Sequence, residues 1–221
     1  MSEIKNTNTN TNTDSAIDAI LKILPESHTI AVDNNEKYAS FSLVFAVVLT
    51  GTSVRLVDTN GFKLYSYQLQ DSQESGIIYR ELVKRLKMMF PQDNIHELPT
   101  MAFRMKFIYG VTIFEHGEKT ILSFSGRKGY SVLSEEGKSG SLDSEFEKIN
   151  EILCGEFPAK KFRLIHKHCL LSADAIANTS AGVTQRGVVV KVGEKLISFV
   201  AEDDPGEKAR LLQSIVAALK S

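Results

Sequence analysis

The chain has 221 residues, of which 43 % are hydrophobic and 24 % charged, as is typical of a soluble globular protein. This composition excludes a disordered chain, a fibrous repeat and a disulfide-stapled miniprotein. The 26 Lys and Arg residues nearly balance the 27 Asp and Glu residues, and the net charge of −1 does not favour a dedicated nucleic-acid-binding protein.

The N-terminal residues 1–13 are rich in Asn and Thr and lack an apolar anchor, so we expect a disordered tail. This region also lacks the apolar segment of a signal peptide. The longest apolar run, Phe41–Leu49, is about half of the roughly 20 residues that span a membrane as a helix. Two cysteines, Cys154 and Cys169, are too few for a disulfide framework, and we expect free thiols. These features predict a cytoplasmic protein without a membrane partner.

Four segments carry apolar residues at helical spacing and are bounded by capping residues or prolines. The third is expected to open with the capping box Ser144–Glu147, and the fourth with the N-cap residue Asp204 before Pro205. The four expected helices run from near Asp14 to Pro25, from near Ser75 to Pro91, from Ser144 to near Pro158, and from Pro205 to Leu219.

Between the helices the apolar period falls to two, which predicts strands joined into hairpins. Asn60-Gly61 marks one hairpin turn. The runs 110–114 and 120–124 form a second hairpin, and 187–190 and 196–200 form a third. We also expect one long buried strand over Phe41–Leu49 and an alternating strand over Phe103–Phe107.

The strands come in hairpins rather than singly, so the fold class is α+β, with antiparallel β-hairpins or sheets alternating with four helices. Pro25, Pro91 and Pro158 lie 66 and 67 residues apart. This period favours two or three degenerate αβββ units of about 65 residues, and a chance period is the alternative. We expect a first α+β unit at residues 14–91 and a second at 92–221, or one continuous domain.

No motif of a phosphate-binding loop, dinucleotide fold, serine hydrolase or zinc peptidase occurs in the sequence. The metal-like cluster is His166, His168 and Cys169, but on a strand Cys169 points away from the two histidines. His96 and Glu97 are adjacent in a proline-flanked loop. Glu115 and His116 are adjacent on a strand, so their side chains point to opposite faces and cannot easily act as an acid–base pair. We therefore assign no catalytic residue, no metal and no cofactor, and leave a non-local active site open.

Positive charge is concentrated in residues 101–130 and 156–170, each with a net charge of +3. If the strand with Arg104 and Lys106 were a neighbour of the strand with Arg163 and Lys167, these cations would form a basic sheet face that binds phosphates, with loop 125–130 at its rim. The candidate nucleic-acid-binding residues are Arg104, Lys106, Arg127, Lys128, Tyr130, Lys160, Lys161, Arg163 and Lys167. The alternative is the ordinary solvated face of an antiparallel sheet.

Residues 14–90 and 143–220 each have the expected order α-β-β-β-α. This order is similar to that of the two small Alu-RNA-binding subunits of the signal recognition particle, a resemblance that implies RNA binding. Bacterial secretion chaperones, which bind unfolded effectors, resemble the chain in mixing a few helices with hairpins. Both resemblances rest on element order and apolar spacing alone, so we assign the chain to no family.

We therefore expect a non-catalytic cytoplasmic binding or adaptor protein that recognises a protein partner through its sheet or an apolar helix face. Self-association is part of this expectation, because a long strand over Phe41–Leu49 needs a covered edge. The alternative is an RNA- or DNA-binding protein that uses the basic sheet face and the 125–130 loop.

Overall fold

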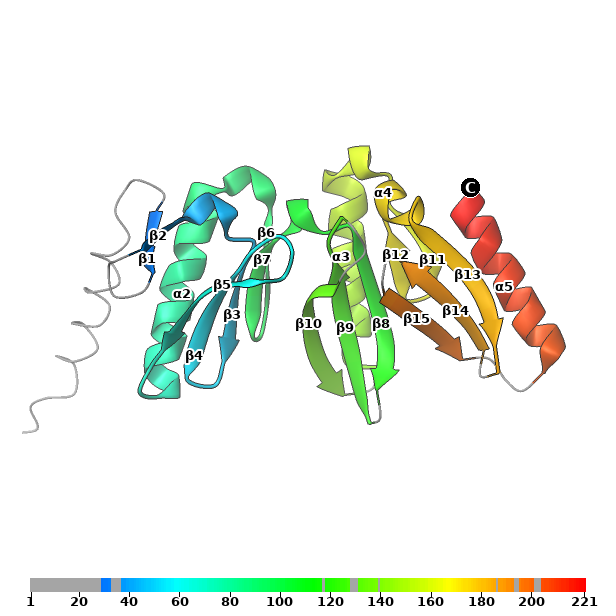
Figure 1. The fold of residues 1–221 in the computed structure, drawn as a ribbon, viewed down its shortest axis with the longest axis horizontal. Coiled ribbons are helices and arrows are strands. Elements are labelled where there is room, and N and C mark those ends of the chain that lie inside the picture. The colour runs from blue at the N-terminus through cyan, green and yellow to red at the C-terminus, as the bar shows by residue number, and fades with distance from the viewer. Residues whose placement is uncertain are drawn as a thin grey trace, which may run out of the picture. The chain divides into compact units, whose positions relative to one another are not determined.

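The computed structural model describes residues 29–32, 37–116, 118–127, 131–138, 140–185, 187–192, 195–200 and 204–221. The expected tail and the expected helix from Asp14 to Pro25 lie outside these residues. Within them, helices alternate with antiparallel sheets, which confirms the α+β class (Figure 1). The chain divides into two compact units, Met1–Phe103 and Arg104–Ser221.

The first unit holds a five-stranded sheet in the order β5-β4-β3-β7-β6, with α2 packed against β3 and β4. Asp71 caps α2 by accepting a hydrogen bond from Glu74 N at 2.8 Å, and the apolar stripe Ile78, Leu82 and Leu86 is buried against the sheet. The elements are β1 (Thr29–Val32), β2 (Lys37–Ser40), η1 (Phe41–Leu43), β3 (Ala46–Thr50), β4 (Ser53–Val57), β5 (Lys63–Gln68), α2 (Ser72–Met89), η2 (Pro91–Asp93), β6 (Ile95–Leu98) and β7 (Met101–Arg104).

The prediction of one strand over Phe41–Leu49 is wrong for its first half. Ser40 accepts a hydrogen bond from Ser42 N at 3.3 Å and starts the 3-10 turn η1, so the strand begins only at Ala46. Both edges of β3 are paired, with β4 on one side and β7 on the other. The covered edge that the sequence called for is therefore supplied within the first unit.

The second unit holds a five-stranded sheet in the order β10-β9-β8-β12-β11 and a three-stranded sheet in the order β13-β14-β15. Helix α3 packs against β8, and α5 packs against β13, β14 and β11. The elements are η3 (Met105–Phe107), β8 (Gly110–His116), β9 (Lys119–Ser125), β10 (Ser131–Lys138), α3 (Asp143–Glu156), η4 (Pro158–Lys160), β11 (Arg163–His166), β12 (Cys169–Leu171), α4 (Ala173–Ile176), β13 (Thr179–Thr184), β14 (Gly187–Val192), β15 (Lys195–Val200) and α5 (Pro205–Lys220).

The predicted start is correct for helix α5 and wrong for helix α3. Asp204 accepts a hydrogen bond from Gly206 N at 2.9 Å, which confirms the predicted start of α5. Helix α3 instead begins at Asp143 after Leu142, which makes no side-chain cap, so Ser144 lies inside the helix and the predicted capping box is wrong. Cys154, near the end of α3, is a free and exposed cysteine.

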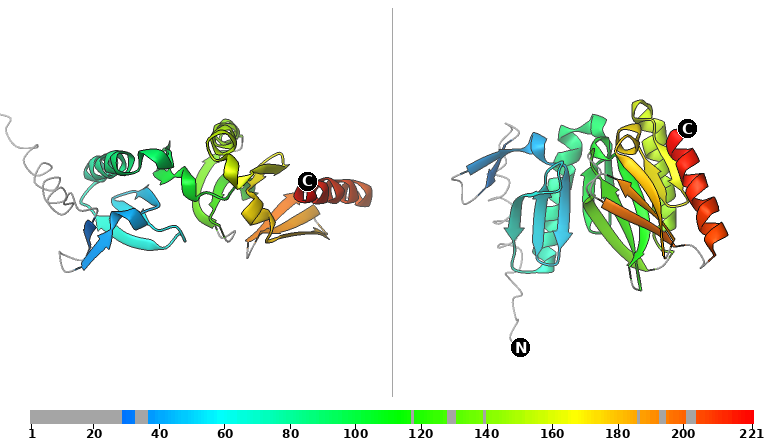
Figure 2. Two further views of the ribbon diagram at one scale, coloured as in Figure 1. Left: turned by 90° about the horizontal axis from the view of Figure 1, so that it is seen from above. Right: turned by 45° about the vertical axis from the view of Figure 1, so that its right-hand side comes forward.

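One order of elements recurs along the chain (Figures 1 and 2). A short helical turn leads into a meander of three strands and then a long helix. In copy 1 (residues 41–104) and copy 2 (105–171), a hairpin follows the long helix, and its second strand pairs back onto the first strand of the meander. Copy 3 (172–221) has the turn, the meander and the helix. Copies 1 and 2 have about the predicted length of 65 residues but hold five strands each rather than three, and copy 3 is shorter.

A search of the described helices for a long apolar stretch finds none that could cross a membrane.

Candidate functional site

The first two predicted cations do not lie on a common strand face. Strand β7 ends at Arg104, and the following residues form the 3-10 turn η3, so the strand predicted over Phe103–Phe107 is wrong beyond Arg104. Arg104 is 4 % exposed and its guanidinium lies 4.6 Å from the centroid of the Phe107 ring. Lys106 is exposed on the turn.

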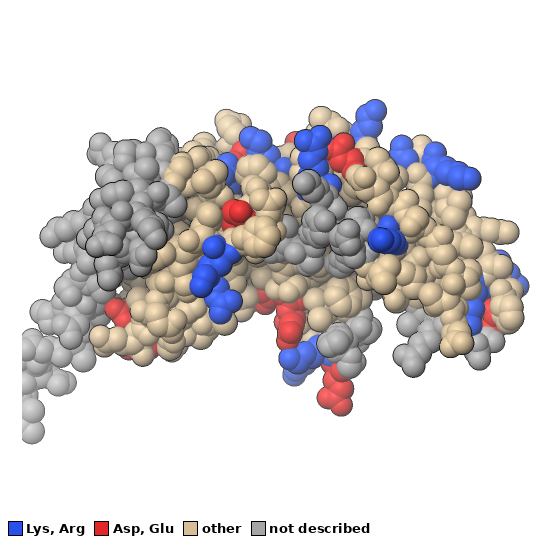
Figure 3. Space-filling model, in the orientation of Figure 1, with Lys and Arg blue, Asp and Glu red and all other residues tan. Residues whose placement is uncertain are grey.

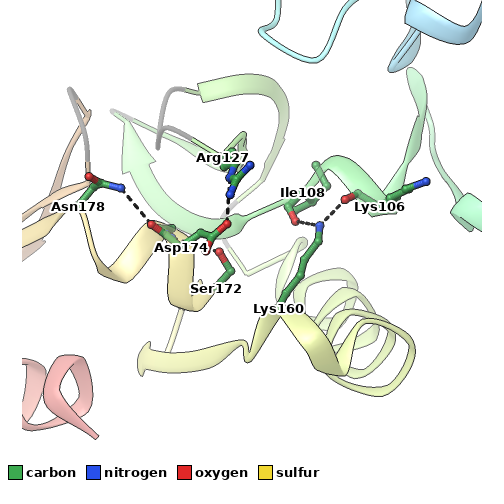
Figure 4. A network of polar contacts seen from close by, with 8 residues as sticks. Lys106, Ile108, Arg127, Lys160, Ser172, Asp174 and Asn178 are labelled. Carbon is green, nitrogen blue, oxygen red and sulfur yellow. Dashed lines mark hydrogen bonds and ion pairs between the residues drawn. The ribbon is translucent and has the colours of Figure 1, made fainter.

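The ammonium group of Lys160 binds backbone carbonyl groups rather than projecting freely into solvent (Figure 4). Its Nζ donates to the backbone carbonyl of Lys106 and, at 2.6 Å, to that of Ile108. The ammonium also lies 4.1 Å from the centroid of the Tyr109 ring. Burial lowers the pKa of Lys160 to about 8, against the opposing influence of the Asp174 carboxylate. The side chain thereby fastens η4 to the segment that enters β8.

Arg127 follows β9 and forms an ion pair with Asp174 of α4, with 3.0 Å between Nε and Oδ2 (Figure 4). Both side chains are largely exposed, so the pair is worth at most about 1 kcal/mol. The structure thus places Arg127 and Lys160 near Asp174, with Lys160 turned toward the carbonyl groups of Lys106 and Ile108.

The remaining predicted cations lie on or near β11. Lys161 is exposed with a positive φ of 50°, Arg163 is half-buried on β11, and Lys167 occupies the turn after it. Lys128 and Tyr130 lie outside the described residues. Arg104 and Arg163 belong to strands of different sheets, so these two cations do not share a sheet face. On the second unit, Figure 3 shows Lys and Arg in separate groups.

The histidines of the metal-like cluster pack against aromatic rings. His166 lies 4.5 Å from the Phe199 ring, and burial together with His168 and Lys167 lowers its pKa. His168 Nε2 lies 3.5 Å from Asp143 Oδ1. In the parts of the chain that the structure describes, no group of three or more His, Cys, Asp and Glu side chains is arranged to hold a metal ion.

The feature that sets the second unit apart is the outer edge of β13. In the described part of the chain, β13 pairs with β14 alone, whereas the corresponding strands β3 and β8 each lie between two strands. Most of β13 is exposed, and Val183 retains 53 % of its accessible surface. An edge strand presents unpaired N–H and C=O groups to any extended chain that approaches it.

The sequence of β13 does not protect this edge. Proteins commonly block an edge strand with a charged residue, a proline or a bulge. The terminal strands β5, β6, β10, β11 and β15 of the three larger sheets each contain at least one charged residue. Strand β13 has the sequence Thr-Ser-Ala-Gly-Val-Thr, without charge or proline, and its register with β14 is regular.

Both ends of β13 are held in place. At its start, Thr179 Oγ1 donates to Ala175 O at 2.8 Å. Asn178 Nδ2 donates to Asp174 O at 3.1 Å (Figure 4), and both bonds hold the start of the strand to α4. At its end, Nζ of the buried Lys208 of α5 donates to Gln185 O at 2.6 Å. A pre-positioned edge loses less conformational entropy when a strand is added.

Sequence reasoning did not identify this edge. The segment 179–184 has small residues and a glycine instead of alternating large apolar residues, so it carries little strand signal. Its position in the repeat, directly after a short helical turn and before a recognisable hairpin, was the signal that could have found it.

Comparison with known proteins gives no further guide, since no family model, no curated protein and no solved structure matches the chain.

Proposed function

We propose that this chain is a non-catalytic binding or adaptor protein that recognises a protein partner by adding an extended strand of that partner to the edge of β13. The observation that carries the proposal is the exposed, uncharged and regular edge of β13 at a place in the repeat where β3 and β8 are covered. Strand addition is a recurring mode of peptide recognition, in which main-chain hydrogen bonds supply much of the affinity.

The surroundings of β13 support this function. The face of its sheet is buried against α5 through Val188, Val190 and Ile215, so the strand rests on a packed core. The anchoring bonds from Thr179 and Lys208 hold the strand extended between α4 and α5. A rigid strand with one open edge is the geometry that strand addition requires.

A site-specific photo-crosslink tests the proposal. A benzophenone amino acid placed at the exposed Ser180 of β13 is expected to form a covalent adduct with a protein that peptide mass spectrometry then identifies. The matched control places the same amino acid at the exposed Ser198 of β15, where we expect no such adduct.

A second variant connects the adduct to strand addition. A side chain built at Gly182 meets nothing within 4 Å, so Gly182→Lys leaves the fold intact and puts a charge on the edge. The variant is expected to remove the Ser180 adduct. Equal labelling from Ser180 and Ser198, or an adduct that Gly182→Lys leaves unchanged, would contradict the proposal. An RNA or DNA adduct at Ser180 would favour the nucleic-acid alternative instead.

A further inference from the structure

Among the described residues, the hairpin β1–β2 belongs to no larger sheet, and the sheet β13-β14-β15 has no hairpin beside its first strand. In copies 1 and 2, the hairpin after the long helix completes a five-stranded sheet. Among the described residues, β1 and β2 pair with each other alone, and β13 has a strand on one side alone. An isolated two-stranded hairpin is at best marginally stable, so it gains most from a third strand.

The place of β2 in the chain identifies it as the counterpart of β7 and β12. Strand β7 ends directly before the turn η3, and β12 ends just before the turn α4. Strand β2 likewise ends directly before the turn η1, at Ser40. Each of these strands is the second strand of a hairpin.

The two complete copies share one register. Ala46, the first residue of β3, lies opposite Phe103, which stands two residues before the start of η3. Gly110, the first residue of β8, lies opposite Leu171, which stands two residues before the start of α4. In both copies, therefore, the residue that stands two positions before the next turn pairs with the first residue of the first meander strand.

We infer that the partner of the β13 edge is a second copy of this chain, whose β2 strand adds antiparallel to β13 with Ala39 opposite Thr179. Ala39 stands two residues before the start of η1, and Thr179 is the first residue of β13. Tyr38 then lies opposite Ser180, and Lys37 opposite Ala181. The inference rests on the proposed function, because it names the strand that the β13 edge binds.

This pairing joins two different surfaces of the same chain. The hairpin lies near the N-terminal end of the sequence and β13 in its third copy, so the contact is heterologous. Heterologous contacts produce closed rings or open chains, according to whether the rotation from copy to copy closes.

Disulfide trapping between two differently tagged full-length chains tests the inference. In a background with the exposed Cys154 replaced by Ser, one chain carries Ala39→Cys and the other Thr179→Cys. Mild oxidation is expected to give a 39–179 linked heterodimer, because opposed strand residues satisfy the short Cα separation that a disulfide needs.

A register control uses Ala39→Cys with Val183→Cys, four residues further along β13, and is expected to give at least about tenfold less heterodimer. Equal yields from the two pairs would overturn the inference. An internal 39–179 disulfide in a doubly substituted chain, without any heterodimer, would overturn it in favour of closure within one chain.

The outcome is independent of the photo-crosslinking test. If no 39–179 link forms but Ser180 still labels a different protein in a way that Gly182→Lys prevents, the inference fails and the proposed function stands. If Ser180 labels no protein and no 39–179 link forms, both are overturned.

Discussion

Strands β8 and β13 open the meanders of copies 2 and 3, but only β8 is buried on both edges. Strand β8 lies between β9 and β12, and Val111 and Thr112 are fully buried. Strand β13 has the same place in the order of elements and pairs with β14 alone among the described residues. The difference teaches that the hairpin after the long helix, and not the meander itself, decides whether the first strand becomes core or edge.

The largest expected effect compares Leu171 of β12 with Val183 of β13. Leu171 is fully buried beside β8, so Leu171→Ala is expected to lower the free energy of unfolding by about 2–5 kcal/mol. Val183 is 53 % exposed, so Val183→Ala is expected to change it by less than about 0.5 kcal/mol. Urea denaturation at protein concentrations where the chain is monomeric measures both values. Comparable losses from the two variants would break the comparison.

Two glycines sharpen the same contrast. A Cβ at Gly110, in β8, would lie 2.8 Å from Leu171 Cδ2 and 3.4 Å from Ser125 Cβ, so Gly110→Ala is expected to cost about 1–3 kcal/mol through overpacking. A Cβ at Gly182, in β13, meets nothing within 4 Å, and Gly182→Ala is expected to be neutral or to stabilise by up to about 1 kcal/mol. Thermal and urea unfolding should rank these variants in that order, and the reverse order would contradict it.

Lys160 binds the backbone just before β8, so replacing Lys160 is expected to destabilise β8, the strand that is paired on both edges. Lys160→Met retains much of the apolar stem but leaves the carbonyls of Lys106 and Ile108 without this donor. We expect a loss of about 1–3 kcal/mol in the free energy of unfolding. Amide hydrogen exchange should show faster exchange in β8 and little change in β14. An unchanged β8 would contradict the role of Lys160 as a tie.

The pKa of Lys160 adds a pH dependence of known sign. Burial lowers this pKa from 10.5 to about 8 in the folded chain, so between these pH values the unfolded chain binds more protons. The free energy of unfolding therefore gains a contribution that rises from about pH 8 to pH 10.5. Urea unfolding at pH 7.5 and pH 10 is expected to show this rise in the parent chain and its loss in Lys160→Met. The same slope in both proteins would contradict the assignment.

The smallest effect concerns the Arg127–Asp174 pair, which links the end of β9 to α4 before β13. Because both side chains are largely exposed, a double-mutant cycle with Arg127→Ala and Asp174→Ala is expected to give a coupling below about 1 kcal/mol. The coupling should fall further in 0.5 M salt, at a Debye length of roughly 4 Å. A larger, salt-independent coupling would show that the pair is more shielded from solvent than its exposure indicates.

Local features of the fold could be predicted from the sequence. Helices α2 and α5 and the hairpins β8–β9 and β14–β15 follow from apolar spacing and from caps within a few residues. The hairpin at Asn60-Gly61 also forms, with a positive φ at Gly61. By contrast, the 3-10 turn at Met105–Phe107 was not predicted. The alternation of apolar and charged residues over Phe103–Phe107 fits a strand, and a turn of three residues is too short to show a helical period of its own.

The candidate site could not be predicted in the same way, because it depends on which strands become neighbours. Arg104 and Lys106 could share a sheet face with Arg163 and Lys167 only if their strands were adjacent, and Arg104 and Arg163 lie on strands of separate sheets. The burial of Lys160 against carbonyl groups depends on contacts between η4 and η3, more than fifty residues apart. The exposure of β13 likewise follows from long-range pairing.

Multi-angle light scattering after size exclusion, over a range of protein concentrations, tests the central claim most directly. The parent chain and the Ser198→Lys control are expected to show a mass that rises above 24.5 kDa with concentration, without excess absorbance at 260 nm. Ser180→Lys is expected to stay at the monomer mass over the same range, since the charge lies opposite Tyr38 on the β13 edge in the inferred register. A parent chain that remains monomeric throughout, or a Ser180→Lys variant that assembles as the parent does, would contradict the claim that a second copy occupies this edge.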